Sequence, residues 1–256
     1  MVRSLYTACT GMVHQMNRLD VVTNNMANSD TTAYKKEGST SQSFDSVYGI
    51  KINDSSVNYI HQNIGRMRLG VKVGETYTDY GDGNLEETEQ LYDMALSGKG
   101  FFAISYADRN GNESVRYTRD GNFTVNSQGV LVTKDGDFVL AEDGGLINIP
   151  EGVKISVDES GRITADGQEI AQLQLVDFED YNYLKKFGEN MYIAIDGATT
   201  TDAQCKVYQG YLEASNVNVV TEMVDMITIT RDYESNQKVI QTIDSTLEKS
   251  VALGRV

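Results

Sequence analysis

The chain has 256 residues, and its 37 Asp and Glu residues against 22 Lys and Arg residues give a formal net charge of −15. This length can bury the core of one large domain or of two small ones. The negative charge argues against nucleic acid or anionic lipid as a partner. Only two cysteines are present, and their spacing suggests neither a zinc site nor a disulfide framework.

An amphipathic helix is predicted over roughly residues 1–28, where apolar side chains repeat every seven residues. The two seam positions hold Leu5, Met12, Leu19 and Met26, and Val2, Cys9, Met16 and Thr23. On this stripe Cys9 is expected to be a small buried hydrophobe. His14 lies beside the stripe and is expected to be a solvated or interface histidine. Several Asn and Asp residues in 24–32 predict the end of the helix, because their side chains compete for backbone hydrogen bonds.

The same period returns at the other end of the chain, over about 35 residues from Val219 to Leu253. Its two seam positions hold Met226, Tyr233, Ile240 and Leu247, and Val219, Met223, Thr230 and Val251. The opposite face carries charged residues that begin with Glu222, which also suits the positive end of the helix dipole.

The region between the helices is predicted to be extended and then β-rich. Residues 31–83 are polar and weakly periodic, which indicates an extended linker with a hairpin. Residues 84–215 contain short apolar runs separated by turn dipeptides such as Asn110-Gly111, Asp135-Gly136 and Ser160-Gly161. This alternation is typical of antiparallel hairpins.

We therefore expect an α+β protein in which the terminal helices, residues 1–30 and 216–256, pair as a coiled coil around an inserted, mainly antiparallel β domain. The alternative is that two ordinary helices pack on the β core. A helix of this length needs a partner for its apolar stripe, so the termini are predicted to form the assembly domain.

No motif indicates catalysis, a cofactor or a metal site. Residues 97–100 have the composition of a phosphate-binding loop, but the P-loop requires Ser or Thr after its lysine, and here Gly100 follows. Residues 108–113 place Gly111 too early for a calcium loop, so a hairpin turn is the better interpretation. His14 and His61 are the only histidines, and no carboxylate pair stands out as an acid and base. We expect the protein not to be an enzyme.

Five blocks together resemble the bacterial flagellar basal-body rod and hook protein family. They are residues 24–28 (NNMAN), followed by Thr31, Ala33, Tyr34 and Lys35, and residues 96–102 (LSGKGFF), 117–123 (YTRDGNF), 188–192 (GENMY) and 209–218 (QGYLEASNVN). The blocks cover both ends and much of the middle. Ala33 stands where the family usually has glycine.

The resemblance implies a structural rod subunit that assembles into a helical tube and transmits torque from motor to hook. It implies copies of the same chain, other rod and hook subunits and the flagellar type III export apparatus as partners, without nucleic acid or membrane insertion. The length favours the distal rod protein or its proximal-rod paralogue over the longer hook protein. Together, the apolar stripes and the resemblance make these residues candidates for self-assembly: Leu5, Cys9, Met12, Met16, Leu19, Asn24, Asn25, Met26, Asn28, Met223, Met226, Tyr233, Ile240 and Leu247.

Localisation follows from the same resemblance. The first residues show no apolar core of a cleaved signal peptide, and no apolar run approaches the length of a membrane span. The sequence by itself would indicate a cytoplasmic protein, whereas the resemblance implies export without a cleaved signal to the basal body, in the periplasm or cell-wall zone. A secreted or surface β-rich protein with a closed coiled-coil stalk remains the alternative.

Overall fold

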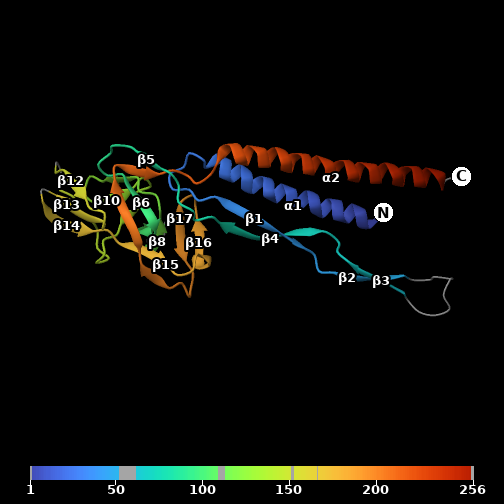
Figure 1. The fold of residues 1–256 in the computed structure, drawn as a ribbon, viewed down its shortest axis with the longest axis horizontal. Coiled ribbons are helices and arrows are strands. Elements are labelled where there is room, and N and C mark those ends of the chain that lie inside the picture. The colour runs from blue at the N-terminus through green and yellow to red at the C-terminus, as the bar shows by residue number, and fades with distance from the viewer. Residues whose placement is uncertain (1, 52–61, 109–112, 151–152, 166, 255–256) are drawn as a thin grey trace. The chain divides into compact units, whose positions relative to one another are not determined.

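The computed structural model describes residues 2–51, 62–108, 113–150, 153–165 and 167–254. The chain divides into two compact units, whose elements are labelled in Figure 1. The helix unit consists of Met1–Ala27, Glu37–Asp79 and Asn218–Val256, and the β unit consists of Asn28–Lys36 and Tyr80–Val217. The predicted turn at residues 110–111 and the linker histidine, residue 61, lie outside the described residues.

The helix unit is built on α1 (Val2–Ala27) and α2 (Val219–Leu253), which confirms the two predicted terminal helices. They lie side by side and antiparallel, with the start of α1 near the end of α2 (Figure 1). Asn218 caps α2, because its side chain accepts a hydrogen bond from the Thr221 amide at 3.1 Å. The fold class is α+β, as predicted.

The two helices meet along a seam with the three-and-four spacing of a coiled coil. On α2 the least exposed positions are Glu222, Met226, Ile229, Tyr233, Asn236, Ile240 and Ile243. On α1 the buried residues are Ala8, His14, Val22 and Asn25. Gly11 brings the helices close together, since a Cβ atom there would lie 3.3 Å from the Asn236 amide nitrogen.

This seam corrects two predictions. Cys9 is exposed rather than buried. Glu222 is buried, although the sequence placed it on the charged face. His14, expected to be a solvated or an interface histidine, is buried. The apolar repeat misidentified part of this face because the side of α1 that meets α2 includes small and polar residues, such as Gly11 beside Asn236 and Gln15 bonded to Asp232.

Two antiparallel strand pairs complete the helix unit. β1 (Glu37–Ser43) pairs with β4 (Val71–Thr78), and β2 (Val47–Lys51) pairs with β3 (Gln62–Met67). Strands β1 and β4 pack against α1. These strands occupy most of the region that the sequence indicated as an extended linker with a hairpin.

The β unit consists of short strands, and every pairing between described strands is antiparallel. The strands are β5 (Leu85–Glu87), β6 (Met94–Lys99), β7 (Phe101–Ala107), β8 (Glu113–Thr118), β9 (Phe123–Val125), β10 (Leu131–Thr133), β11 (Phe138–Val139), β12 (Ile155–Val157), β13 (Arg162–Ala165), β14 (Gln168–Gln172), β15 (Leu175–Phe178), β16 (Leu184–Phe187), β17 (Met191–Ala194), β18 (Thr200–Asp202), β19 (Gln204–Gln209) and β20 (Tyr211–Glu213). A short 3-10 helix, η1, spans Tyr181–Tyr183.

Nine strands form the largest sheet, in the order β16-β17-β8-β7-β11-β10-β9, with β15 also beside β7 and β18 beside β15. β12, β13 and β14 form a second sheet, and β6–β19 and β5–β20 form separate pairs. Strand β7 supplies both cores of the unit. Phe102 belongs to the larger apolar cluster, whereas its neighbour Phe101 packs with Phe178, Leu184 and Tyr192 in the smaller one. This follows from the alternation of side chains along a strand.

Neither described helix is long and apolar enough to cross a membrane.

Candidate functional site

The chain passes between the two units four times, after residues 27, 36, 79 and 217. Residues next to these passages are held by buried polar contacts within each unit. We call the contacts in the helix unit the helix clasp (Asn25, Glu37 and Glu222) and those in the β unit the root cluster (Lys35, Arg119 and Glu213).

The helix clasp is centred on Asn25, whose side chain is 1% exposed. Its Nδ2 donates to the Glu37 carbonyl at 2.9 Å, and its Oδ1 accepts from the Glu37 amide at 2.9 Å. The same Nδ2 lies 3.3 Å from Oε2 of the buried Glu222. A single amide side chain therefore fixes the end of α1, the start of β1 and the first turn of α2.

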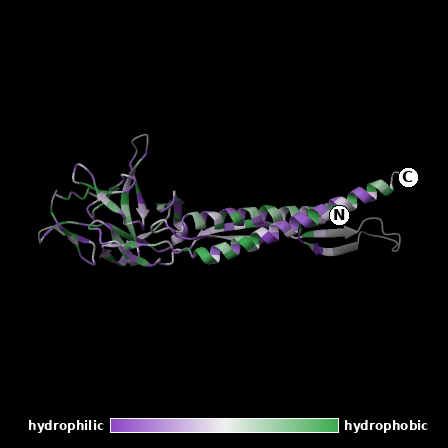
Figure 2. Cartoon of the chain, turned by 90° about the horizontal axis from the view of Figure 1, so that it is seen from above, coloured by the Kyte–Doolittle hydropathy of each residue, from purple (hydrophilic) through white to green (hydrophobic). Residues whose placement is uncertain are grey.

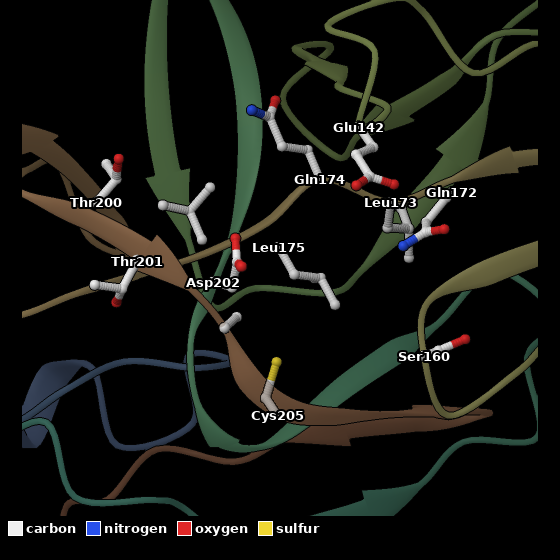
Figure 3. Close-up of a pocket in the computed structure, with 12 residues that line it drawn as sticks. Glu142, Ser160, Gln172, Leu173, Gln174, Leu175, Thr200, Thr201, Asp202 and Cys205 are labelled. Carbon is white, nitrogen blue, oxygen red and sulfur yellow. The ribbon is translucent and has the colours of Figure 1, made fainter.

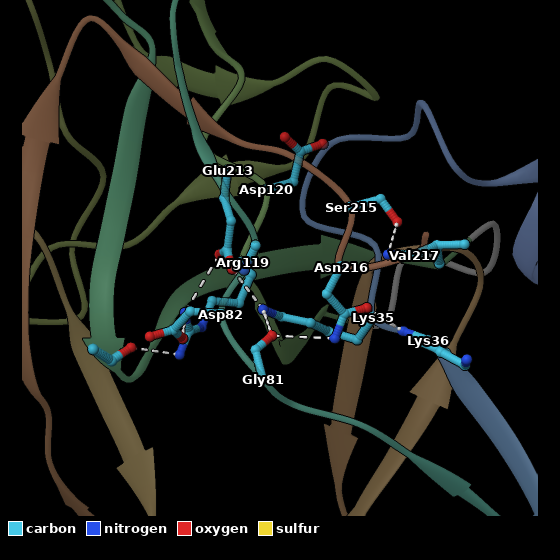
Figure 4. A network of polar contacts seen from close by, with 12 residues as sticks. Lys35, Lys36, Gly81, Asp82, Arg119, Asp120, Glu213, Ser215, Asn216 and Val217 are labelled. Atoms are coloured by element: carbon cyan, nitrogen blue, oxygen red, sulfur yellow. Dashed lines mark hydrogen bonds and ion pairs between the residues drawn. The ribbon is translucent and has the colours of Figure 1, made fainter. Parts of the chain in front are cut away.

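The root cluster buries two cations around one carboxylate (Figure 4). The Nζ atom of Lys35 lies 2.5 Å from Oε1 of Glu213, and Nη1 of Arg119 lies 3.3 Å from Oε2. All three side chains are at most 3% exposed. Burial lowers the pKa of Lys35, and the neighbouring Glu213 carboxylate opposes that shift. Burying such charges is costly unless each is paired, as it is here.

Backbone groups complete the root cluster. Lys35 Nζ also donates to the Gly81 carbonyl at 2.8 Å, and the Gly83 amide donates to Oε1 of Glu213 at 2.9 Å. Asn216 accepts from the Lys36 amide at 2.7 Å and donates to the Gly81 carbonyl at 3.2 Å. The segments before β1, after β4 and before α2 are thus tied to one point of the β unit (Figure 4).

Ala33, which is bonded to the backbone of Glu213, has an unusual backbone conformation. Its φ of 54° is left-handed, it is fully buried, and its amide donates to the Glu213 carbonyl at 2.7 Å. Glycine adopts such a φ without the clash that a Cβ atom causes. Its burial and its hydrogen bond to Glu213 hold the alanine in this left-handed conformation.

A second polar link joins two of the sequence blocks to the segment that follows α1. The Asp120 carboxylate accepts hydrogen bonds from the Thr32 hydroxyl and from the Asn190 amide, both at 2.9 Å. Burial raises the pKa of Asp120, and hydrogen bonds from the Asn122 amide and the Thr32 hydroxyl oppose that shift. Blocks far apart in sequence therefore meet in the β unit.

The predicted self-assembly residues separate into three groups by exposure. Asn25 is buried. Partly exposed are Leu5, Met12, Leu19, Met26, Asn28, Met226, Tyr233 and Ile240. Exposed are Cys9, Met16, Asn24, Met223 and Leu247. The structure thus brings Met226, Tyr233 and Ile240 to the helix seam and leaves Met16, Met223 and Leu247 on the outside.

Both helices expose large apolar side chains, and hydrophobic residues alternate with hydrophilic ones along both helices (Figure 2). On α1 they are Tyr6, Val13 and Met16, and on α2 they are Val220, Met223, Val224, Ile227, Val239, Leu247, Val251 and Leu253. We call them the outer apolar faces. A groove of about 220 Å³ between the helices is lined by Gln15, Met16, Leu19, Ile229, Thr230 and Tyr233. Contiguous exposed apolar surface is a common feature of interaction sites.

The β unit also contains a polar cavity of about 510 Å³ (Figure 3). Its lining includes Glu142, Gln172, Gln174, Asp202 and Cys205. Burial raises the pKa of the Cys205 thiol, which disfavours the nucleophilic thiolate. Among the described residues, no group of three His, Cys, Asp or Glu side chains could hold a metal ion. The cavity does not resemble a catalytic centre.

The sequence interpretation missed Lys35, Arg119, Glu213 and Glu222 as functional candidates. The first three lie in or beside the sequence blocks quoted above, which was the available signal. Glu222 precedes Ile229 by seven residues and Asn236 by fourteen, and this heptad spacing is the signal that could have identified it as a seam residue.

A helix pair with exposed apolar faces, linked to a β unit by four passages of the chain, is typical of a structural and assembling protein. Comparison with known families agrees. Residues 5–35 match the family "Flagella basal body rod protein", residues 95–165 match "Flagellar hook protein FlgE/F/G D1 domain", and residues 208–253 match "Flagellar basal body rod FlgEFG protein C-terminal".

Similar proteins span the whole chain. The flagellar basal-body rod protein FlgG of Buchnera aphidicola subsp. Schizaphis graminum is 34% identical, with 97% of this chain and 98% of the relative covered. FlgG of Bacillus subtilis is 32% identical with both chains fully covered. FlgF of Caulobacter vibrioides is 34% identical, with 98% and 96% covered. The chain belongs to the flagellar basal-body rod protein family, and it is a structural subunit of that rod.

Proposed function

We propose that the subunit assembles with copies of itself, through the outer apolar faces of α1 and α2, into a helical tube that transmits torque without catalysis. The observation that carries the proposal is the exposure of Met16, Met223 and Leu247 on helices whose seam is already filled. One helix pair covers only one side of each helix, so neighbouring copies must supply the remaining contacts.

The distribution of charge supports association through the helix unit. That unit contains 10 Lys and Arg residues against 12 Asp and Glu residues, whereas the β unit contains 12 against 25. Nearly all of the net charge of −15 therefore belongs to the β unit. Copies that meet through the helix unit bring little net charge together, which limits repulsion.

The helix clasp and the root cluster suit a protein under mechanical load. Torque carried by a tube of helices must pass through the four chain passages to reach the β unit. Buried ionic and amide contacts fix the residues beside these passages within each unit. We infer that the two clusters resist local unfolding where the chain changes unit.

We place the subunit in the distal rod, in contact with other rod and hook subunits. The chain length and the FlgG relatives support this position, and the FlgF relative makes the proximal rod the alternative. Export through the flagellar type III apparatus without a cleaved signal accounts for a basal-body location. Immunogold labelling of isolated basal bodies against the terminal helices tests the position along the rod.

Self-assembly is tested by sedimentation and negative-stain microscopy of the purified chain across a concentration series. Open tubes or filaments that lengthen with concentration support the proposal, because a contact between different surfaces of each copy extends without limit. A closed particle of fixed size would instead identify a coiled-coil stalk, and a monomer at all concentrations would contradict self-assembly.

A further inference from the structure

The β unit contains a run of six antiparallel strands with two open edges. In the order β18-β15-β7-β8-β17-β16, each strand pairs with the next. Among the described residues, β18 pairs only with β15, and β16 pairs only with β17. An open edge presents unpaired backbone groups to another chain.

The hydrogen bonds next to each edge show which residues face outward. The Glu179 amide donates to the Thr199 carbonyl at 3.3 Å, and the Ile195 amide donates to the Tyr183 carbonyl at 2.9 Å. Hydrogen-bonded pairs in an antiparallel ladder occur at every second residue. The backbone groups of Thr200 and Asp202 on β18, and the carbonyl of Leu184 on β16, therefore point away from the sheet. The Leu184 amide donates to the Tyr181 carbonyl.

The two edges run in opposite directions, because six antiparallel strands alternate in sense. A second copy in the same orientation would therefore place its β16 antiparallel to β18 of the first copy. If the Leu184 carbonyl accepts a hydrogen bond from the Asp202 amide, the next residues along the contact, Lys185 and Thr201, lie opposite each other. Both edge strands are short, with four residues in β16 and three in β18.

The edges also differ in charge. Lys185 on β16 is exposed, whereas residues 198–204, which contain β18, include no basic residue. Asp202 on β18 and the exposed Glu142 both line the polar cavity beside that strand (Figure 3). A positive edge on one copy and a negative edge on the next favour association between unlike edges and disfavour association between like ones.

We propose that β16 of one copy adds to the open edge of β18 of a second copy, so that the sheets of successive β units become continuous. The contact is separate from the helix faces but rests on the proposed association of copies. Addition of a strand to an open edge is a recurrent mode of protein recognition, in which backbone hydrogen bonds supply the affinity. Unlike edges on each copy allow the array to continue.

A disulfide test measures the register directly. In full-length protein that carries Cys9→Ser and Cys205→Ser, we would introduce Lys185→Cys together with Thr201→Cys. These positions lie at opposite edges of the six strands, about 24 Å apart within one copy, so they cannot be bridged intramolecularly. In the proposed contact they form a close pair between copies. Oxidation of the assembled protein should give a ladder of covalent dimers, trimers and larger species.

The matched control combines Lys185→Cys with Thr200→Cys, one residue out of register and on the other side of the sheet. We expect at least about tenfold less cross-linked product from this control. Equal products from the two variants, or no ladder from the first, would overturn the edge contact and show that the short charged edges do not pair between copies. Sedimentation of the uncross-linked protein separates the two proposals, because assembly without a ladder contradicts only this one.

Charge supplies a second measurement. Lys185→Glu should raise the concentration needed for assembly at least about fivefold in low salt, because it brings a negative group to the acidic edge. Lys154→Glu makes the same change in net charge at an exposed residue that lies on neither edge. Equal assembly of the two variants would count against the proposed contact.

Discussion

The amide of Asn25 forms both of its short hydrogen bonds, each 2.9 Å long, with the backbone of Glu37. It does so as donor and as acceptor, which a carboxylate cannot do at neutral pH. Asn25→Asp preserves size but places a buried charge opposite the Glu37 carbonyl and the Glu222 carboxylate. We expect it to lower the free energy of unfolding by about 2–4 kcal/mol.

Urea unfolding followed by circular dichroism measures this loss at neutral pH. Asn17→Asp is the matched control, because it makes the same chemical change at an exposed position of the same helix. We expect its effect to be within about 0.5 kcal/mol of the wild type. A similar loss from both variants would show that the buried hydrogen bonds of Asn25 do not determine its role.

The root cluster predicts a difference between buried and exposed ion pairs. Lys35→Met leaves Glu213 buried with one of its two cationic partners missing, and we expect a loss of about 3–5 kcal/mol in thermal or urea unfolding. The Lys206–Glu159 pair has a similar distance of 2.7 Å, but both side chains are 60% exposed. Lys206→Met should therefore change the melting temperature little. A small effect of Lys35→Met would contradict the role of the cluster.

Ala33 predicts a stabilising substitution. Ala33→Gly removes the Cβ atom from a residue with a φ of 54°. We expect a gain of up to about 1 kcal/mol, because relief of the left-handed strain exceeds the added freedom of the unfolded chain. Ala33→Val should destabilise strongly, since a β-branched side chain is least tolerated at this φ. Both are measured by thermal unfolding, and a less stable glycine variant would contradict the argument.

How far the sequence predicts this structure depends on the range of the interaction. Seven-residue repeats gave both helices, and turn glycines such as Gly129 and Gly161 gave several hairpins, because these signals are local. The polar strands β16 and β18 have no apolar alternation and were not predicted. The convergence of Lys35, Arg119 and Glu213 depends on tertiary contacts between distant segments, which periodicity does not encode.

The helix seam shows the same distinction at single residues. Met226, Tyr233 and Ile240 were placed correctly, because the seam of α2 has an apolar repeat. Cys9 was placed wrongly because its part of the α1 stripe is exposed, and Glu222 was placed wrongly because its charge indicated the solvent side of α2. An apolar stripe shows that a partner exists but does not show whether the partner is the same chain or a neighbour.

His14 predicts a pH dependence of the helix unit. Its side chain is buried, and burial, with a smaller effect of Arg18, holds its pKa below the ordinary value of 6.5. The unfolded chain therefore binds a proton first as the pH falls. The associated stability is present above about pH 6.5 and is lost as the pH falls through the folded-state pKa. Urea midpoints between pH 5 and 7.5 measure the slope, and His14→Gln should reduce it. An unchanged slope in that variant would exclude His14 as the source.

The outer apolar faces predict that folding and assembly can be separated. Leu247 lies on α2 with 36% of its side chain exposed, beyond the last buried positions of the seam. Leu247→Asp places a charge where a neighbouring copy is proposed to pack, and that cost recurs at every subunit of a tube. We expect the isolated variant to keep the wild-type circular dichroism and export, but to form no tubes and support no motility.

Gln241→Asp adds the same charge to an exposed polar position of the same helix and should assemble. Isolation of basal bodies from cells that carry each variant provides the measurement. Normal rods built from Leu247→Asp would contradict assembly through this face, whereas loss of assembly in both variants would show that added negative charge on α2, rather than the apolar face, is responsible.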